Sequence, residues 1–273
     1  MKNFKKLLAV LLAGLMLLSL AACGGKKDDN VVKMGELADA NFSSNAEHEA
    51  HLKNDSADIE IDNVKYNNLT SALMDLESGK ISILAVNGCT ADYIVAHNDK
   101  FSVEEGDVPA YSSMMTLDSN QEVYDILNNA IKEMKTDGTL ESLIENELKA
   151  YINSDPEAKD LPHFDGARTI KVGVTGDLPP MDFVAANGKA AGFNIALLTE
   201  IANRTQVNIE LVQIETGART MALSSGKVDA VFWAVAMTCP VCNINATEKV
   251  EGTLLTESYF SDYSAFIKLK SDK

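Results

Sequence analysis

The clearest helical pattern along the chain lies between residues 120 and 135. Its apolar side chains recur three or four positions apart, which is the spacing of a helix that buries one face. These residues are Val123, Ile126, Leu127, Ala130, Ile131 and Met134. The dipeptide Asp137-Gly138 ends the pattern, and Thr139 is placed to cap a second apolar-faced helix that reaches Leu148. The pattern therefore predicts two consecutive helices.

Two other stretches share one pattern of a helix, a turn and a strand. They are "LMDLESGKISILAV" at 73–86 and "TMALSSGKVDAVFWAV" at 220–235. In both, helically spaced apolar residues precede Ser-Gly-Lys, and an apolar run rich in β-formers follows it. Glycine commonly follows the last turn of a helix, so Gly79 and Gly226 are expected to end these helices. Ser-Gly-Lys lacks the upstream glycine of a phosphate-binding loop, so we interpret it as a repeated helix stop.

The second half of the chain alternates between strand and helix patterns. Strands are expected at 170–174, 207–214 and 228–235, with helices at 194–204 and 218–226 between them. The last strand is an unbroken apolar run, which is typical of a parallel strand covered on both faces. The order β-α-β-α-β predicts a parallel α/β sheet with right-handed connections.

The first half shows a weaker alternation. Strands are expected at "VVKMGEL", 81–86 and 111–117, and a polar helix is expected to begin near Ser43 or Ser44. The segment 153–166 is rich in proline, glycine and acidic residues, so it is expected to be a linker.

The N-terminus has the pattern of an export signal. "MKNFKK" is basic, and the 14 apolar residues after it are too few for a comfortable membrane span. The signal ends in "LAAC", which resembles the box of bacterial lipoproteins. That resemblance implies cleavage before Cys23, a lipid on its thiol, and a protein anchored to the bacterial cell membrane outside the cytoplasm. An ordinary cleavage site with a coincidental cysteine is the alternative.

The net charge and the cysteines limit the partners and the chemistry that the chain can have. The formal net charge of −16 excludes nucleic acid as a partner, because phosphate binding needs a basic surface. Besides Cys23 the chain has Cys89, Cys239 and Cys242, and the last two form "CPVC". A local disulfide, free thiols, or metal or redox use stay open for this pair. A zinc site needs about four ligands, which the pattern does not supply, so neither a metal nor a cofactor is expected.

Residues 168–270 resemble a known family. The matching motifs, in order, are Pro179-Pro180-Met181, Gly188, Gly192-Phe193, Ala222-Leu223-Ser225-Gly226-Lys227-Asp229 and Tyr259-Phe260-Ser261-Tyr263. They resemble the first lobe of the extracytoplasmic solute-binding proteins, family 3, the amino-acid-type receptors of ABC importers. The resemblance implies an α/β fold of the periplasmic-binding-protein-like type II, in which two lobes joined by a hinge close on a small molecule.

The earlier half resembles the rest of that family in swapped order. "LTSALMDLESGKISILAVNGCTADYIVAHN" is similar to the second lobe, and "YSSMMTLDSNQEVYDILNNAIKEMKTDGTLESLIENEL" to a returning hinge strand with the closing helices. A circular permutation explains this order, and a truncated tandem of two receptors is the alternative. The terminal strand 262–270 is then expected to pair in the hinge beside 111–117 without continuing into lobe two. The expected divisions are a signal peptide (1–22), a tether (23–33), lobe two (34–110), hinge crossing and closing helices (111–152), a linker (153–167) and lobe one (168–273).

Ligands of open α/β sheets bind at the carboxyl ends of the strands, which gives the candidate site. The candidates are Asn41, Asn87, Thr90, Asp177, Met181, Arg219, Trp233, Ala236 and Thr238. The family's carboxylate-binding arginine is absent after Thr238, and Asn87 stands at its ammonium-binding aspartate. The ligand is therefore expected to be a small polar solute, either an amino acid or a related compound.

Several candidates have a structural alternative. Arg219 could clamp a carboxylate or be an exposed helix residue. Trp233 could stack on a ligand or pack in the core, and Met181 could line the cleft or pack in the core. Asp177 could cap a turn, and Asn87 could belong to a strand-end turn.

The expected function is delivery of a solute to ABC permease subunits by a monomeric binding protein. A ligand-sensing module for a membrane partner is the first alternative. An enzyme on the same scaffold is the second, although the sequence contains neither GxSxG nor HExxH.

Overall fold

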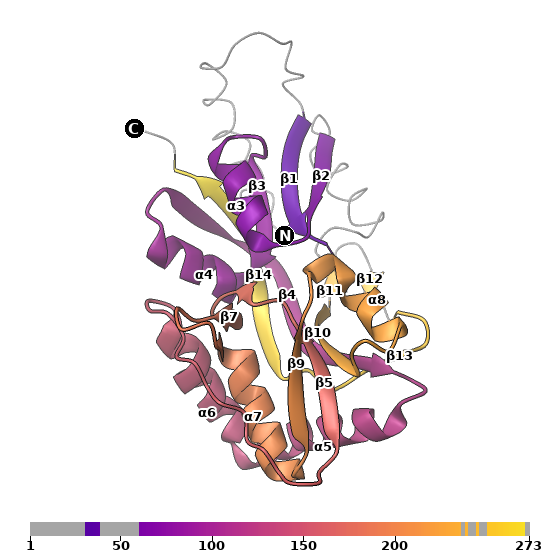
Figure 1. The fold of residues 1–273 in the computed structure, drawn as a ribbon. Helices are drawn as coiled ribbons and strands as arrows, with labels where there is room; N and C mark the ends of the chain where they lie inside the picture. Colours follow the sequence, from indigo (N-terminus) through magenta and orange to yellow (C-terminus); the bar gives the residue numbers. More distant parts are fainter. Residues whose placement is uncertain (1–30, 39–59, 236–237, 240–243, 246–249, 271–273) are drawn as a thin grey trace.

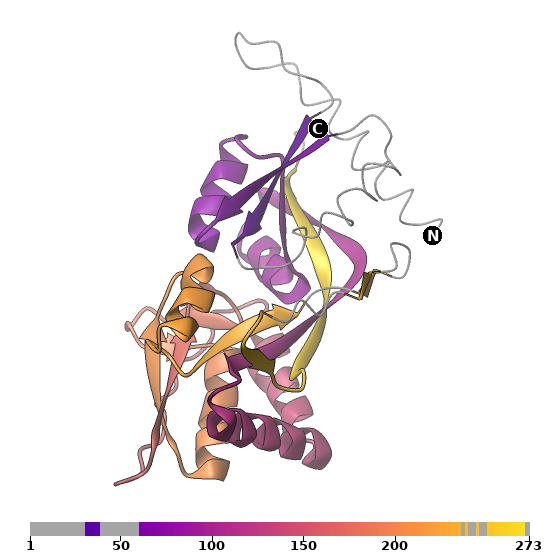
Figure 2. The same cartoon turned by 90° about the vertical axis from the view of Figure 1, so that its right-hand side faces the viewer.

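Two long strands connect two α/β lobes. The computed structural model describes residues 31–38, 60–235, 238–239, 244–245 and 250–270. The main sheet has the strand order β2-β1-β3-β14-β4-β10-β5-β9, and β13 also pairs with β4. Strands β4 (Phe101–Leu117) and β14 (Phe260–Leu269) run from one lobe into the other (Figures 1 and 2).

In its described residues, lobe two contains three parallel strands and two helices. They are β1 (Val31–Leu37), β2 (Glu60–Tyr66), α3 (Leu69–Glu77), β3 (Ile83–Asn87) and α4 (Gly88–His97). β1 pairs in parallel with both β2 and β3, and β14 pairs antiparallel with β3. The core of this lobe is apolar, with Leu76, Leu84 and Ile267 almost fully buried. Burial of these side chains supplies the main free energy that holds the lobe together.

Lobe one is built on the other end of the main sheet. Its strands are β5 (Thr169–Val174), β9 (Asn208–Gln213), β10 (Ala230–Val235) and β13 (Thr253–Leu255). Its helices are α5 (Gln121–Asp137), α6 (Thr139–Leu143), a π turn (Ile144–Leu148), 3-10 turns (Lys149–Tyr151 and Thr216–Ala218), α7 (Phe193–Thr205) and α8 (Arg219–Ser224). The short strands β6 (Asp177–Leu178), β7 (Asp182–Val184) and β8 (Ala190–Ala191) form a separate sheet, and β11 (Thr238–Cys239) pairs with β12 (Ile244–Asn245).

Side chains from α5 and α7 form the largest core on one face of the lobe-one sheet. The apolar positions of α5 that the periodicity identified are buried there, including Val123, Leu127 and Met134. Side chains of α8 pack on the opposite face against Val231 and Trp233. The strands of this lobe are therefore covered on both faces, as the unbroken apolar run at 228–235 predicted.

The two lobes have the same strand order. In lobe two the parallel strands are ordered β2-β1-β3, and β14 and β4 follow as antiparallel neighbours. In lobe one the order is β9-β5-β10, and β4 follows as an antiparallel neighbour with β13 and β14 beside it. In each lobe, the first of its own parallel strands along the chain lies between the second and the third. The third strand then pairs with a long strand that comes from the other lobe.

The repeated Ser-Gly-Lys has one structure in both lobes. Gly79 and Gly226 are left-handed, with φ of 74° and 69°, and their N–H groups donate to the carbonyls of Leu76 and Leu223. Next, the N–H groups of Ser82 and Asp229 both donate to a carbonyl of the neighbouring parallel strand, each at 2.8 Å. The prediction of one helix-turn-strand unit used twice is confirmed. A left-handed residue after the last turn is the reason glycine stands there.

The long strands pair beside each other, but in a register that differs from the expected one, because residues 262–269 pair with residues 101–110 and not with 111–117. Phe260 to Tyr263 pair with residues 109–112, and a register shift between Tyr263 and Ala265 separates them from the pairing of the remaining residues. The expectation that the terminal strand does not continue into lobe two is wrong. Residues 264–267 pair with β3, and Ala265 and Ile267 are fully buried in the lobe-two core. The alternation of buried positions along the strand makes it a central strand of that lobe.

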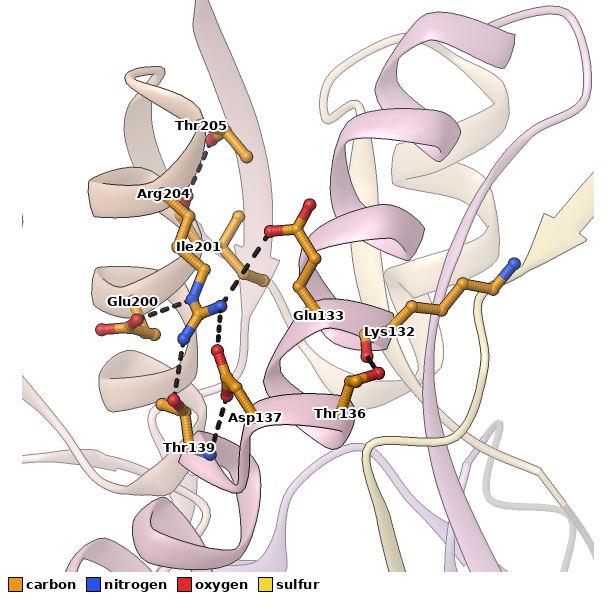
Figure 3. A network of polar contacts seen from close by, with 9 residues as sticks. All are labelled: Lys132, Glu133, Thr136, Asp137, Thr139, Glu200, Ile201, Arg204 and Thr205. Atoms are coloured by element: carbon orange, nitrogen blue, oxygen red, sulfur yellow. Dashed lines mark hydrogen bonds and ion pairs between the residues drawn. The ribbon is translucent and has the colours of Figure 1, made fainter.

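The junction between α5 and α6 also differs from the prediction. Gly138, with φ of 82°, occupies the cap position of α6, and the hydroxyl of Thr139 accepts a hydrogen bond from Arg204 at 2.8 Å. Arg204 extends from α7 and pairs with Asp137 as well, as Figure 3 shows. Thr139 therefore helps to tie the closing helices to α7 instead of capping its own helix.

Some expectations concern residues outside the described part of the chain. These are the signal peptide, most of the tether, the polar helix near Ser43 or Ser44, and the pairing of Cys239 with Cys242. Within the described residues, no helix has the length and apolar character that crossing a membrane requires.

Candidate ligand-binding cleft between the lobes

The carboxyl ends of strands from both lobes meet at the lobe junction. The Oδ2 atom of Asp177, just beyond β5, accepts a hydrogen bond of 2.8 Å from the backbone N–H of Leu69 in α3. The N–H of Thr216 donates to the carbonyl of Asn67 at 3.1 Å, and Leu178 packs against the core of lobe two. These contacts place the end of β5 and the start of α8 directly against lobe two. This edge is the candidate cleft.

Asp177 is half-buried. Burial favours the protonated form of its carboxyl group, and the hydrogen bonds that it accepts favour the charged form. Burial raises the pKa of its carboxyl group, whereas hydrogen bonds from the backbone of Leu69 and Thr70 and from Thr175 lower it. Burial is the largest of these causes, so the pKa lies above the ordinary value of 3.8. The carboxylate caps a helix of the other lobe, a role that neither sequence interpretation of Asp177 anticipated.

Asp182 fixes the loop that carries Asp177. Its two carboxylate oxygens accept hydrogen bonds from the N–H groups of Thr175 and Gly176, at 2.8 and 2.9 Å. It is only 3% exposed, and this burial raises the pKa of its carboxyl group. The residue was missed from the sequence because its position in a proline-rich loop gives no periodic signal.

On the lobe-two side, Asp262 likewise accepts a hydrogen bond from a backbone N–H group. Its carboxylate, on the hinge strand β14, accepts a hydrogen bond of 2.7 Å from the N–H of Cys89 in the first turn of α4. Burial raises the pKa of its carboxyl group and of the Cys89 thiol. A carboxylate at a helix N-terminus is stabilised by the helix dipole. The contact joins residues 173 positions apart, which explains why sequence reasoning missed it.

Asn87 and Thr90 lie beside this contact. Asn87 ends β3 and precedes α4, but its side chain makes no cap hydrogen bond, and its Oδ1 atom is buried without a hydrogen-bond partner. Thr90 is 2% exposed within α4. The structure therefore brings Asn87, Thr90 and Asp262 together on the lobe-two side of the junction.

Arg219 is buried, so its interpretation as an exposed helix residue is wrong. It is 7% exposed, its Nε donates to the carbonyl of Thr216 at 3.1 Å, and its Nη1 donates to the carbonyl of Phe232 at 3.0 Å. The guanidinium carbon lies 5.1 Å from the centroid of the Trp233 ring, a cation–π distance. Trp233 is 3% exposed and packs with the apolar side chains between α8 and the sheet.

The remaining candidates lie elsewhere or outside the described part. Met181 is 5% exposed in the core of lobe one, which agrees with its packing alternative. Asn41 and Ala236 fall outside the described residues, and for Thr238 only the backbone of β11 is described. Within the described residues, no group of three histidine, cysteine, aspartate or glutamate side chains could hold a metal ion.

These features define the class of protein. Two α/β lobes of the same strand order, joined by long strands and facing each other at strand ends, form a periplasmic-binding-protein-like fold of type II. The sequence model of the bacterial extracellular solute-binding proteins, family 3, matches residues 170–240. A probable histidine-binding protein of Campylobacter jejuni subsp. jejuni is 28% identical over 104 residues, which are 38% of this chain and 37% of that protein. Both matches are to solute-binding proteins, and each covers less than half of this chain.

Solved structures with similar folds include binding proteins and regulators. The ligand-binding component of an ABC-type import system from Staphylococcus aureus has a TM-score of 0.46 at 11% identity, with 86% of this chain and 65% of that chain covered. The GluR0 ligand-binding core in complex with L-glutamate has a TM-score of 0.43 at 11% identity, with coverages of 89% and 86%. CbnR, a LysR family transcriptional regulator, has a TM-score of 0.46 at 8% identity, with coverages of 89% and 64%.

Proposed function

We propose that the chain binds a small polar solute, an amino acid or a related compound, between its lobes and delivers it to the permease of an ABC importer. The family match at 170–240 and the Campylobacter relative, both of binding proteins, support this proposal. The observation that carries it is the hydrogen bond between Asp177 and Leu69. Because strand ends of both lobes meet there, a solute at this edge would contact both lobes and favour their closure.

The site residues of this proposal come from both sides of the junction. Lobe two would contribute Asn87 and Thr90, and lobe one would contribute Asp177, Arg219 and Trp233. Asn41, Ala236 and Thr238 stay in the proposal as candidates. The roles are binding roles, and no enzymatic step is proposed.

A thermal-shift screen tests the proposed solute class. The panel contains L-amino acids, amino-acid analogues, short peptides and organic acids, and the name of the Campylobacter relative makes L-histidine the first compound to test. A true ligand at a hundredfold excess over its Kd should stabilise the folded protein by about 2.7 kcal/mol. An amino acid that raises the melting temperature supports the proposal, and a panel without any stabilising compound contradicts it.

We further propose that Cys23 carries the membrane anchor. Two acyl chains on one cysteine give stable attachment, because each buried CH₂ contributes about 0.8 kcal/mol. Labelling of growing cells with a radioactive fatty acid should mark the wild-type protein and leave a Cys23→Ser variant unlabelled. Equal labelling of both would contradict the anchor.

The order of the lobes supports a circular permutation. Strands of lobe two precede strands of lobe one, and each lobe has one copy of the Ser-Gly-Lys unit among the described residues. A gene that encodes residues 168–273 before residues 31–152 tests this idea. The rearranged protein should fold and bind the ligand of the wild type. A rearranged protein that stays unfolded contradicts the permutation and favours the truncated tandem.

Sensing is the second candidate function. A sensing protein would use the same cleft as an importing one and would differ only in its membrane partner. Neighbouring genes therefore discriminate between sensing and import. Genes for a permease and an ATPase would favour import, and a gene for a kinase or a cyclase would favour sensing.

A further inference from the structure

Two buried hydrogen-bonding groups on lobe one have no partner among the described residues. They are the indole Nε1–H of Trp233 and the hydroxyl of Thr216. The two residues are 3% and 1% exposed. Buried polar atoms in folded proteins are nearly always hydrogen-bonded, so two unpaired groups in one place need an explanation.

Arg219 connects these two groups in space. Its Nε lies 3.1 Å from the carbonyl oxygen of Thr216, and its guanidinium carbon lies 5.1 Å from the centroid of the Trp233 ring. A positive charge that is 7% exposed therefore contacts both residues, through the carbonyl of Thr216 and the ring face of Trp233. We call Thr216, Arg219 and Trp233 the Arg219 cluster.

The Arg219 cluster lies at the lobe junction. The backbone N–H of Thr216 donates to the carbonyl of Asn67 in lobe two, and Gly217 next to it faces Asn67 and Ala38. Figures 1 and 2 show α8, which begins at Arg219, next to lobe two near the start of α3. A group held by the cluster would therefore lie on the lobe-one side of the proposed cleft.

We infer that the Arg219 cluster binds the carboxylate of the solute. An indole nitrogen can only donate a hydrogen bond, so the group opposite Trp233 must be an acceptor. A hydroxyl donor and a buried guanidinium beside it favour an acceptor with negative charge, and a carboxylate has two such oxygens. This inference rests on the proposed function. It assigns the carboxylate to a short helix before β10, whereas the family resemblance places the binding arginine after Thr238.

Conservative substitutions test the cluster without removing its packing. Thr216→Val removes the hydroxyl, and Trp233→Phe removes the N–H while an aromatic ring stays. Calorimetric titrations with the twenty L-amino acids, and with the primary amide of the one that binds most tightly, give affinities for wild type and variants. Thr116→Val is the matched control, because Thr116 is 0% exposed and its hydroxyl is also unpaired, but it pairs with Ala230 and is not part of the cluster.

The inference predicts different effects on binding and on folding. Each cluster variant should weaken binding of the free amino acid by about tenfold or more, because it removes a hydrogen bond to a charged group. Thr216→Val should be as stable as the wild type or more stable, since it removes an unpaired buried polar atom, whereas Trp233→Phe also leaves a cavity and should be less stable. We expect the amide to bind the wild type more weakly than the free amino acid does, and its affinity should change less in the variants. Thr116→Val should bind the amino acid normally.

The outcomes separate this inference from the proposed function. Trp233 is the only tryptophan of the chain, so its fluorescence should also change when an amino acid is added to the wild type. Calorimetric binding that Thr216→Val and Trp233→Phe leave unchanged would overturn the carboxylate site and leave the proposed function intact. The absence of calorimetric binding for every amino acid would overturn both.

Discussion

The carboxylate of Asp177 and the backbone N–H of Leu69 form a hydrogen bond of 2.8 Å between the two lobes. Asp177 follows the first strand of lobe one, and Leu69 begins the helix that precedes the Ser-Gly-Lys turn of lobe two. An acceptor at the start of a helix pairs an N–H group that has no partner within the helix. One side chain therefore caps a helix and also holds the lobes together.

Replacing Asp177 with alanine should loosen the contact between the lobes. The substitution removes the acceptor for the Leu69 N–H, and the loss of a helix cap costs about 1 kcal/mol of stability. We expect a lower free energy of unfolding in urea and a larger radius of gyration in small-angle X-ray scattering. Asp177→Asn is the control, because its amide oxygen can still accept the hydrogen bond. Identical radii for wild type and Asp177→Ala would contradict a role in lobe contact.

The network around Arg204 predicts a specific pH dependence. A hydrogen bond from Arg204 and further ones from Thr139 lower the pKa of Asp137 from 3.8 to about 2 (Figure 3). A lowered pKa stabilises the folded state above the unfolded value, and this stabilisation is lost as the pH falls through the folded value of about 2. In Arg204→Ala the pKa of Asp137, measured by NMR, should move back toward 3.8, because the largest cause of its lowering is removed.

Arg204→Ala should also make the free energy of unfolding depend less steeply on pH in the acid range. Below the ordinary carboxylate range, the wild type should lose more stability than Arg204→Ala, since the pKa of Asp137 is lowered further in the wild type. Lys132→Ala is the control, because it removes a positive charge from α5 while the contacts of Arg204 in Figure 3 remain. A pKa of Asp137 that is equal in wild type and Arg204→Ala would disprove the assignment.

The two Ser-Gly-Lys turns should respond equally to substitution. A Cβ atom at Gly79 or at Gly226 would meet no other atom within 4 Å, so the cost of alanine there arises from the left-handed backbone alone. That cost is about 1–2 kcal/mol for an L-residue. We expect Gly79→Ala and Gly226→Ala to lower the free energy of unfolding by similar amounts in urea. Asparagine tolerates this conformation better, and a smaller loss for Asn than for Ala would support the explanation.

The sequence predicted the elements that carry their own periodic signal. Helix α5, the strands β3, β5, β9 and β10 and both Ser-Gly-Lys units could be predicted because their apolar spacing is local. The extension of β14 into lobe two could not, because Ala265 and Ile267 become a core pattern only beside a partner strand. Pairing between distant segments has no local signature.

The candidate site was predicted less completely than the fold. The strand ends pointed to Asn87 and Asp177, which lie at the lobe junction, since ligand sites of α/β sheets follow from strand direction. Asp182 and Asp262 were missed because their hydrogen bonds go to backbone N–H groups, which any sequence can provide. The burial of Arg219 could not be predicted from the sequence either, because its hydrogen-bond partners are backbone carbonyl groups, which every residue has.

The central claim is that a solute binds between the lobes and needs their closure. Gly217 lies at this junction, where an added Cβ atom would be 2.8 Å from Asn67 Oδ1 and 2.9 Å from Ala38 Cβ. A leucine at 217 therefore fits only if the lobes separate. Ser224→Leu adds a side chain of the same size at an exposed position on α8, so it serves as the matched control.

The most direct measurement is calorimetric titration of wild type, Gly217→Leu and Ser224→Leu with every L-amino acid that stabilises the wild type. Circular dichroism spectra of the three proteins establish that each variant is folded. We expect saturable 1:1 binding to wild type and Ser224→Leu, and binding weakened by about a hundredfold or more in Gly217→Leu, because a bound solute must contact both lobes. Equal affinities of Gly217→Leu and the wild type, or no binding to the wild type, would contradict binding between the lobes.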